Sequence, residues 1–220
     1  MRRTRNAGGL RTVTGIGVFS ALAFITTLIC KLIPSVGGFL SLDAKDSVIA
    51  IASFIYGPVA APIISVIVAF VEFVTISETG WYGLVMNIAS SATFSLVASI
   101  IYKYRRSFNG AIIGFGAAVV ATTSVMLLLN IFITPLYFGF PRSVVFDMLP
   151  TLILPFNFAK TLLNSAIALL LYKPIINALR AAGLVPKAKY KTTFNRSSAL
   201  AIIIGGASLL VALIVLLIIW

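Results

Sequence analysis

The sequence predicts an all-α membrane protein, and its composition and its apolar runs support that class. The chain has 220 residues, of which 60% are hydrophobic and only 10% are charged, and its mean hydropathy is +1.10. Soluble domains carry about 25% charged residues. The apolar residues form runs of about 18 residues or more, which suit membrane-spanning helices, whereas the strands of a membrane barrel are short and alternating.

Seven apolar segments are expected to form helices, separated by polar, glycine-containing or proline-containing stretches. They are residues 13–33, 47–56, 59–76, 81–102, 111–136, 154–171 and 199–220. The second segment is too short to cross a bilayer unless it begins deep or extends back to Leu42. We expect Pro135 to close the fifth segment, and residues 137–148 to form a loop.

The predicted organisation has four parts. They are a basic N-terminus (1–12), a six-helix membrane domain (13–173), a basic linker (174–198) and an additional seventh helix (199–220).

The charge distribution predicts the orientation in the membrane. The chain has 17 Lys and Arg but only 5 Asp and Glu. With the N-terminus in the cytoplasm, most cations fall in inner regions, and the acids fall on the outer side, as the positive-inside rule requires. We therefore expect a multi-pass cell-membrane protein with an extracellular C-terminus, and we expect the bilayer, not nucleic acid, to be the partner of its basic residues.

Several kinds of chemistry are not expected. Cys30 is the single cysteine and histidine is absent, so the commonest metal ligands and the commonest general base are missing. The sequence has no glycine-rich phosphate loop and no nucleophile elbow. We expect neither an enzyme, nor a metal site, nor a resident cofactor, and the energy for any transport must come from an ion gradient or from partner proteins.

The sixth segment contains the strongest candidate site. On a helix, Asn157, Lys160, Thr161 and Asn164 share one face. A charged group at membrane depth costs about 2.5 to 3.5 kcal/mol, which favours a functional role for Lys160. The alternative is that Lys160 extends its ammonium group to the interface. For Asn164, which is deeper, a hydrogen bond between helices is favoured.

Other polar groups are expected at the same outer depth. They are Asp43, Lys45, Asp46, Glu72, Asn87 and Asn130. Asparagine amides offer donors and an acceptor, which complement a heterocycle edge with alternating N–H and C=O groups. Stacking surface could come from the aromatic side chains of Phe39, Trp81, Tyr82, Phe156 and Phe158. For Trp81 and Tyr82 a place in the interfacial aromatic belt is favoured.

Four stretches resemble the substrate-binding S components of energy-coupling factor (ECF) vitamin transporters, and above all their riboflavin-specific branch. These stretches are 42–46 (LDAKD), 54–58 (FIYGP), 129–130 (LN) before Pro135, and 154–160 (LPFNFAK). The resemblance covers about residues 13–173 and implies a six-helix S component. Such a subunit binds a vitamin from outside and associates with a transmembrane coupling subunit and two ATPases.

The resemblance also implies roles for individual residues. Asn130, Asn157 and Lys160 would contact the transported flavin, with Leu42 and Asp43 close to it, and Asn87 matches a recurrent asparagine of the family. The small residues Gly17 and Ala21 would meet the coupling subunit, because small residues allow close helix approach.

The sequence departs from the riboflavin branch after Asp43. Ala44 and Lys45 replace Phe and Ser, and Val48 replaces Pro. An aromatic wall is lost and a cation is gained, so Lys45 could bind a phosphorylated or anionic ligand such as flavin mononucleotide.

Two alternatives to riboflavin transport remain. The first is an S component for another vitamin, such as pantothenate, a thiamine precursor or pyridoxine. The second is a membrane-embedded enzyme or scaffold that uses Asp43, Asp46 and Glu72.

Overall fold

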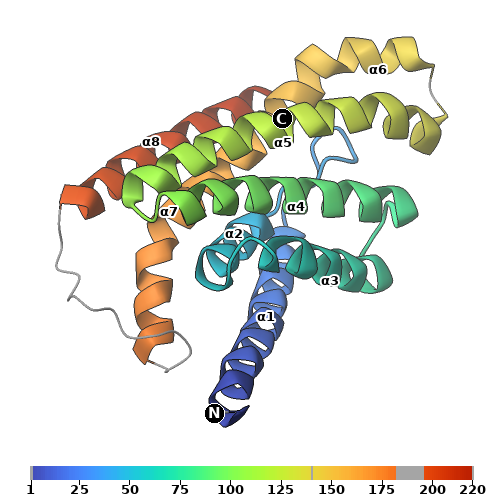
Figure 1. The fold of residues 1–220 in the computed structure, drawn as a ribbon. Helices are drawn as coiled ribbons and strands as arrows, with labels where there is room; N and C mark the ends of the chain where they lie inside the picture. The colour runs from blue at the N-terminus through green and yellow to red at the C-terminus, as the bar shows by residue number, and fades with distance from the viewer. Residues whose placement is uncertain (1, 140, 182–195, 220) are drawn as a thin grey trace.

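The structure is a computed structural model that describes residues 2–139, 141–181 and 196–219. These residues form α-helices and one π-helical turn (Figure 1). In chain order the elements are α1 (Arg2–Cys30), α2 (Lys45–Tyr56), α3 (Ala60–Thr75), α4 (Gly80–Tyr104), α5 (Phe108–Phe138), α6 (Arg142–Met148), the π-helical turn η1 (Leu149–Ile153), α7 (Leu154–Ala181) and α8 (Arg196–Ile219).

Helix α2 is the centre of the bundle and packs against α1, α3, α4 and α7. Residues 45–53 are all buried. The helix has 12 residues, so it is about 18 Å long and much shorter than the hydrocarbon core of a bilayer, which is about 30 Å. Since α2 begins at Lys45, deep in the bundle, room remains above its N-terminus. That room is bordered by the segment that joins α1 to α2.

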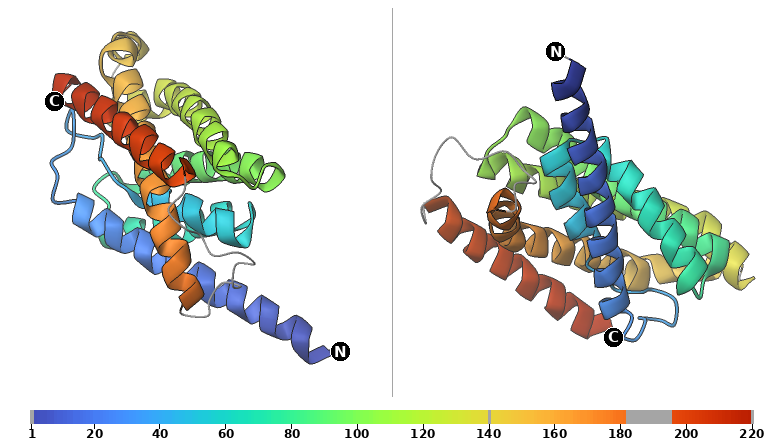
Figure 2. Two further views of the ribbon diagram at one scale, coloured as in Figure 1. Left: turned by 90° about the vertical axis from the view of Figure 1, so that its left-hand side faces the viewer. Right: turned by 90° about the horizontal axis from the view of Figure 1, so that it is seen from below.

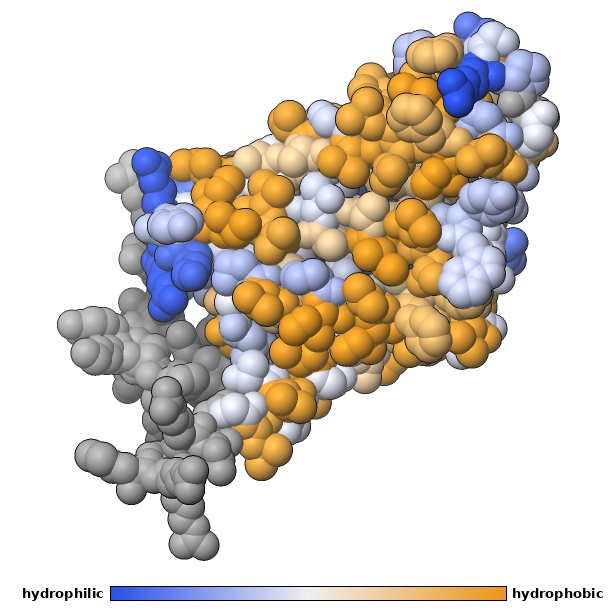
Figure 3. Space-filling view, turned by 45° about the vertical axis from the view of Figure 1, so that its right-hand side comes forward, coloured by the Kyte–Doolittle hydropathy of each residue, from blue (hydrophilic) through white to orange (hydrophobic). Residues whose placement is uncertain are grey.

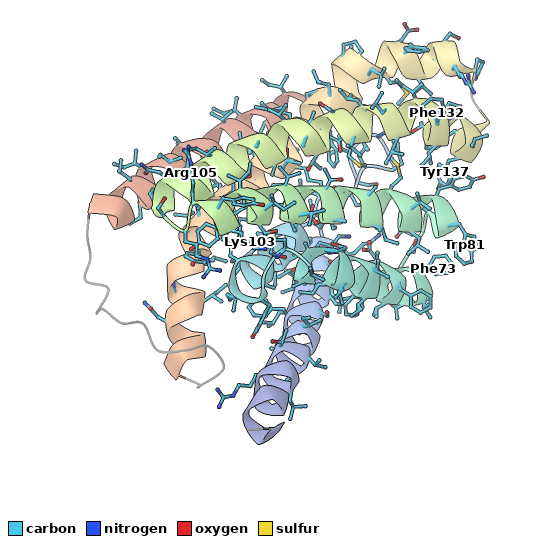
Figure 4. The ribbon with its side chains drawn as sticks, in the orientation of Figure 1. Phe73, Trp81, Lys103, Arg105, Phe132 and Tyr137 are labelled. Atoms are coloured by element: carbon cyan, nitrogen blue, oxygen red, sulfur yellow. The ribbon has the colours of Figure 1, made fainter. Side chains whose placement is uncertain are left out.

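The surface of the bundle is that of a multi-pass membrane protein. Five helical stretches among the described residues are long and apolar enough to span a membrane, and α3 is a shorter apolar helix. Figure 3 shows apolar side chains over the middle of one face, with hydrophilic residues gathered at its two ends. Figure 4 shows Trp81, Phe73 and Tyr137 toward one end of the bundle, and Lys103 and Arg105 toward the other.

Several predicted boundaries differ from the structure. Helix α5 continues past Pro135 to Phe138, and the predicted loop 137–148 contains α6. The residue that ends α5 is Gly139, which has a left-handed φ of 71° and whose N–H bonds to Pro135 O at 2.9 Å. Glycine adopts this conformation without steric cost, so it terminates the helix more effectively than the proline does.

The two ends of the predicted membrane domain differ as well. Helix α1 begins at Arg2, so most of the basic segment 1–12 is helical. Helix α7 runs through Pro174 to Ala181, so the first part of the predicted linker is helical, and residues 182–195 lie outside the described residues. The last part of α7 turns away from its first part (Figures 1 and 2), as expected where a proline removes a backbone hydrogen bond.

Helix α8 lies along α7 (Figure 2). Its buried face includes Gly205, Ala212 and Leu216. A Cβ on Gly205 would lie 3.0 Å from Leu170 Cγ and 3.4 Å from Ala166 O. The absence of a side chain at this position therefore allows the two helices to approach closely, as small residues do in membrane bundles.

Candidate substrate-binding site

A cavity of about 180 Å³ lies at the end of the bundle above α2. Its wall comes from the segment between α1 and α2, the end of α3 and the turn after it, the first half of α4, the second half of α5 and the start of α7. Lining residues from these five parts include Phe39, Asp43, Glu72, Asn87, Asn130, Asn157 and Lys160. Segments far apart in the sequence therefore share one polar hollow.

The start of α7 is shaped by a π-helical turn. This turn, Leu149–Ile153, contains Pro150, and Pro155 follows in the first turn of α7. The Asn157 side-chain Nδ2 donates to Ile153 O at 2.8 Å, so the side chain satisfies a carbonyl at the junction. Single π turns often occur at functional sites, and here the turn precedes the face that presents Phe156, Asn157 and Lys160 to the cavity.

Two buried amides are held in place but keep capacity for a ligand. Asn130 Nδ2 donates to Met126 O at 2.7 Å, and Asn130 Oδ1 accepts from Thr134 Oγ1 at 2.8 Å. A primary amide has two N–H donors and an oxygen with two lone pairs. The local hydrogen bonds of Asn130 and Asn157 therefore fix these side chains and leave further donors and acceptors for a bound molecule.

Four buried charged groups form a chain of ion pairs beside the cavity. Lys160 Nζ lies 2.7 Å from Asp43 Oδ2, and Lys45 Nζ lies 2.7 Å from Glu72 Oε2 and 3.6 Å from Asp43 Oδ2. All four residues are buried. Removing one partner of a buried pair typically costs about 3 to 5 kcal/mol, because the other charge is left without compensation. Each of these four charged groups is thus held in place by its ion-pair partner.

One carboxylate oxygen of these ion pairs has no hydrogen-bond partner among the described residues. Asp43 Oδ1 is buried, and no hydrogen bond reaches it from the part of the protein that the structure describes. Buried carboxylate oxygens are normally paired, since an unmade bond costs about 1 to 3 kcal/mol or more for a charged group. Asp43 lines the cavity, so this oxygen can accept a hydrogen bond from an N–H or O–H group of a ligand.

Asn164 and Asp46 have structural partners behind the cavity. Asn164 Oδ1 accepts from Ser47 N at 2.8 Å, and Asn164 Nδ2 donates to Asp43 O at 2.8 Å. Ala44, the N-cap residue of α2, has no side-chain cap bond, so Asn164 supplies the missing acceptor from α7. The predicted bond between helices is confirmed for Asn164. Asp46 Oδ1 accepts from Ser91 Oγ.

Aromatic side chains form part of the cavity wall. Phe39 meets Phe138 edge to face at 5.1 Å between ring centroids, and Tyr82 meets Tyr137 at 5.6 Å. These four residues and Phe156 line the cavity. Tyr82 thus contributes to the wall, although the sequence favoured the interfacial belt for it. Trp81 and Phe158, the other aromatic candidates, do not line the cavity and are exposed.

The structure brings together most of the residues that the sequence singled out for the ligand. Asp43, Asn87, Asn130, Asn157 and Lys160 line the cavity. Two further candidates do not line it. Leu42 packs against the cluster that contains Val36 and Leu40, and the ammonium of Lys45 lies between Asp43 and Glu72.

The sequence did not single out several other lining residues. They include Lys31, Ser77, Glu78, Ser90, Thr134 and Tyr137. Most of them lie at or near a helix end, so the sequence signal that could have found them is a polar or aromatic residue near the end of an apolar segment.

The small residues Gly17 and Ala21 lie on an exposed face of α1. No described atom lies within 4 Å of a Cβ built on Gly17. This face is therefore open to another helix. Among the described residues, no group of three or more His, Cys, Asp or Glu residues could hold a metal ion.

A multi-pass bundle with a polar and aromatic cavity at one end defines a membrane protein that binds a small molecule. The comparisons then show its family. The family model "ECF transporter, substrate-specific component" matches residues 11–176, which is more than half of the chain, so the chain belongs to the S components of ECF transporters. The family and the all-α fold that the sequence predicted are confirmed.

Two curated relatives and one solved structure are similar to the chain. The Staphylococcus aureus (strain TCH60) riboflavin transporter RibU is 32% identical over 185 residues, covering 81% of this chain and 97% of the relative. The Bacillus subtilis (strain 168) riboflavin transporter FmnP is 27% identical over 179 residues, covering 76% and 94%. A solved S component of a bacterial ECF transporter has a TM-score of 0.67 and 31% identity, covering 78% of this chain and 99% of that one.

Proposed function

We propose that this protein binds riboflavin from outside the cell and delivers it for uptake through a coupling subunit and two ATPases. The observation that supports this most is the meeting of Asn157 and Lys160 from α7 with Asp43 in one aromatic-walled cavity. The family membership defines a substrate-binding component. Two relatives carry the name riboflavin transporter, and their ligand is extended here to this chain.

The chemistry of the cavity suits a flavin ring. The pyrimidine-like edge of the isoalloxazine alternates N–H and C=O groups, which the amides of Asn130 and Asn157 can complement. Lys160 has three donors, so it can donate to a ring carbonyl while it remains paired with Asp43. Asp43 Oδ1 would accept from a ring N–H or a ribityl hydroxyl. Phe39 and Phe156 would supply apolar contact to the ring faces.

The charges of the cavity favour the neutral vitamin over its phosphate ester. The lining contains three carboxylates, from Asp43, Glu72 and Glu78, and two ammonium groups, from Lys31 and Lys160. Lys45 lies behind this lining and is paired with two carboxylates. The site therefore has no excess positive charge for a phosphate, and the anionic ligand suggested by Lys45 in the sequence is not supported.

We propose that the basic end of the bundle faces the cytoplasm and that α1 contacts the coupling subunit. Lys103 and Arg105 lie at the end of the bundle away from Trp81 and Tyr137 (Figure 4), and the positive-inside rule assigns that end to the cytoplasm. The cavity then opens outward and the N-terminus lies inside. The exposed Gly17 on α1 would meet the coupling subunit, since a helix can approach its backbone closely.

A fluorescence titration of the purified full-length chain tests this function. Riboflavin is fluorescent, and we expect its emission to be quenched when the ring stacks in the cavity. Flavin mononucleotide should bind at least about tenfold more weakly, a difference of about 1.4 kcal/mol. Unchanged flavin emission at micromolar concentrations, together with thermal protection by pantothenate, a thiamine precursor or pyridoxine, would overturn the riboflavin assignment.

A further inference from the structure

Helix α8 lies outside the part of the chain that the family model matches, which ends at residue 176. Its last turns nevertheless reach the cavity end of the bundle. Both views of Figure 2 show the C-terminal end of α8 beside the loop that follows α1. The two segments are distant in the sequence, so their contact requires a physical explanation.

The contact is a buried apolar cluster. Leu216 of α8 belongs to one cluster with Val36 and Leu40 of the loop and with Phe156 and Ala159 of α7. Leu216 is 6% exposed. Its neighbour Leu217 is 79% exposed, so the two leucines differ in burial but not in chemistry. The cluster places the side chain of Leu216 directly behind the cavity wall, to which Leu40 and Phe156 belong.

The loop segment between Val36 and Leu40 is a tight turn with one face on this cluster and one on the cavity. Val36 N bonds to Leu40 O at 2.9 Å, and Leu40 N bonds to Val36 O at 3.1 Å. Gly37 and Gly38 have φ values of 60° and 81°, a conformation that glycine adopts readily. Gly38, Phe39 and Leu40 line the cavity. A ligand that fills the cavity therefore lies against this turn.

We propose that α8 is a brace that holds the turn 36–40 against α7, and that Leu216 is the positioning residue of this brace. The inference rests on the proposed riboflavin binding for its effect on the ligand. Gly205 and Ala212, seven residues apart on the buried face, anchor α8 along α7, and Leu216 extends the same face to the turn. By holding the turn where it lines the cavity, the brace slows ligand release.

Hydrogen exchange on the ligand-free protein tests the brace without the vitamin. In Leu216→Ala, the amides of the peptide that contains residues 36–40 should exchange at least about tenfold faster, whereas peptides of α3 and α4 should keep their rates. Leu217→Ala should exchange like the wild type. If Leu216→Ala folds poorly, Leu216→Val takes its place. It removes only one methylene, so the exchange of this peptide should change in the same direction by a smaller amount. Equal exchange of this peptide in the Leu216 and Leu217 variants would overturn the inference.

Stopped-flow fluorescence then tests the effect on the ligand. Riboflavin should dissociate from Leu216→Ala about tenfold faster, with little change in the association rate, while Leu217→Ala should match the wild type. Wild-type protein that does not bind riboflavin would refute the proposed function but would leave the exchange result to decide the brace. Faster exchange of the turn with an unchanged dissociation rate would refute the role of the brace in ligand release.

Discussion

Lys160 is the residue whose replacement tests the site most sharply. In Lys160→Met the side chain stays unbranched and nearly as long, being one atom shorter, and it loses its charge. A hydrogen bond to a charged group contributes about 1.5 to 3 kcal/mol, so the Kd for riboflavin should rise by a factor of about 10 to about 140. Isothermal titration or flavin quenching measures this change. The control is Lys103→Met. Lys103 is exposed in the last turn of α4, away from the cavity, so its replacement should leave the Kd unchanged.

The same replacement removes the 2.7 Å partner of Asp43, so stability must be measured separately. The ligand-free protein should unfold at a lower temperature, although Lys45 at 3.6 Å partly compensates the remaining carboxylate. In Lys160→Met with Asp43→Asn, the uncompensated charge disappears, so the melting temperature should recover while riboflavin binding stays weak. A folded Lys160→Met variant whose Kd lies within twofold of the wild type would reduce Lys160 to a structural partner of Asp43.

Three further replacements separate binding, stability and coupling. Asn130→Leu leaves Thr134 Oγ1 without its acceptor and should weaken riboflavin binding by about 1 to 3 kcal/mol. An unchanged Kd for riboflavin would show that this amide does not contact the ligand. Lys45→Met should lower the melting temperature more than it changes the Kd. Adding Glu72→Gln should recover part of the lost stability, because the uncompensated charge is then gone. A rise in Kd as large as that of Lys160→Met would instead make Lys45 a ligand residue. Gly17→Leu should keep riboflavin binding but abolish uptake into cells, because the new side chain blocks close helix approach. The control Ala207→Leu, on the exposed face of α8, should leave binding and uptake unchanged. Loss of binding together with uptake in Gly17→Leu would contradict the coupling role.

The sequence predicted the spans and part of the cavity because both depend on local chemistry. Long apolar runs give helices in a membrane whatever their neighbours are. Asn157 and Lys160 were identified because polar groups at membrane depth are costly. Asn164 was assigned to a bond between helices on its depth alone, and its partners in the Asp43–Ser47 segment bear this out.

The position of Lys45 could not be predicted, because it depends on tertiary contacts. The sequence places Lys45 two residues after Asp43, and it does not show that Glu72, at the far end of α3, supplies a carboxylate 2.7 Å away. Tyr82 was similarly ambiguous, since an aromatic residue at a helix end suits both an interface and a cavity wall. The seventh helix was predicted as a span, but its place along α7 depends on contacts such as those of Gly205 with Ala166 and Leu170, which only the fold reveals.

A structure of the riboflavin-bound protein tests the central claim most directly. The account predicts the flavin ring in the cavity above α2, with its pyrimidine edge within hydrogen-bond distance of Asn157 and Lys160 and a donor group on Asp43 Oδ1. A flavin bound elsewhere, with the Asp43–Lys160 pair unchanged and the cavity filled only by water, would contradict it.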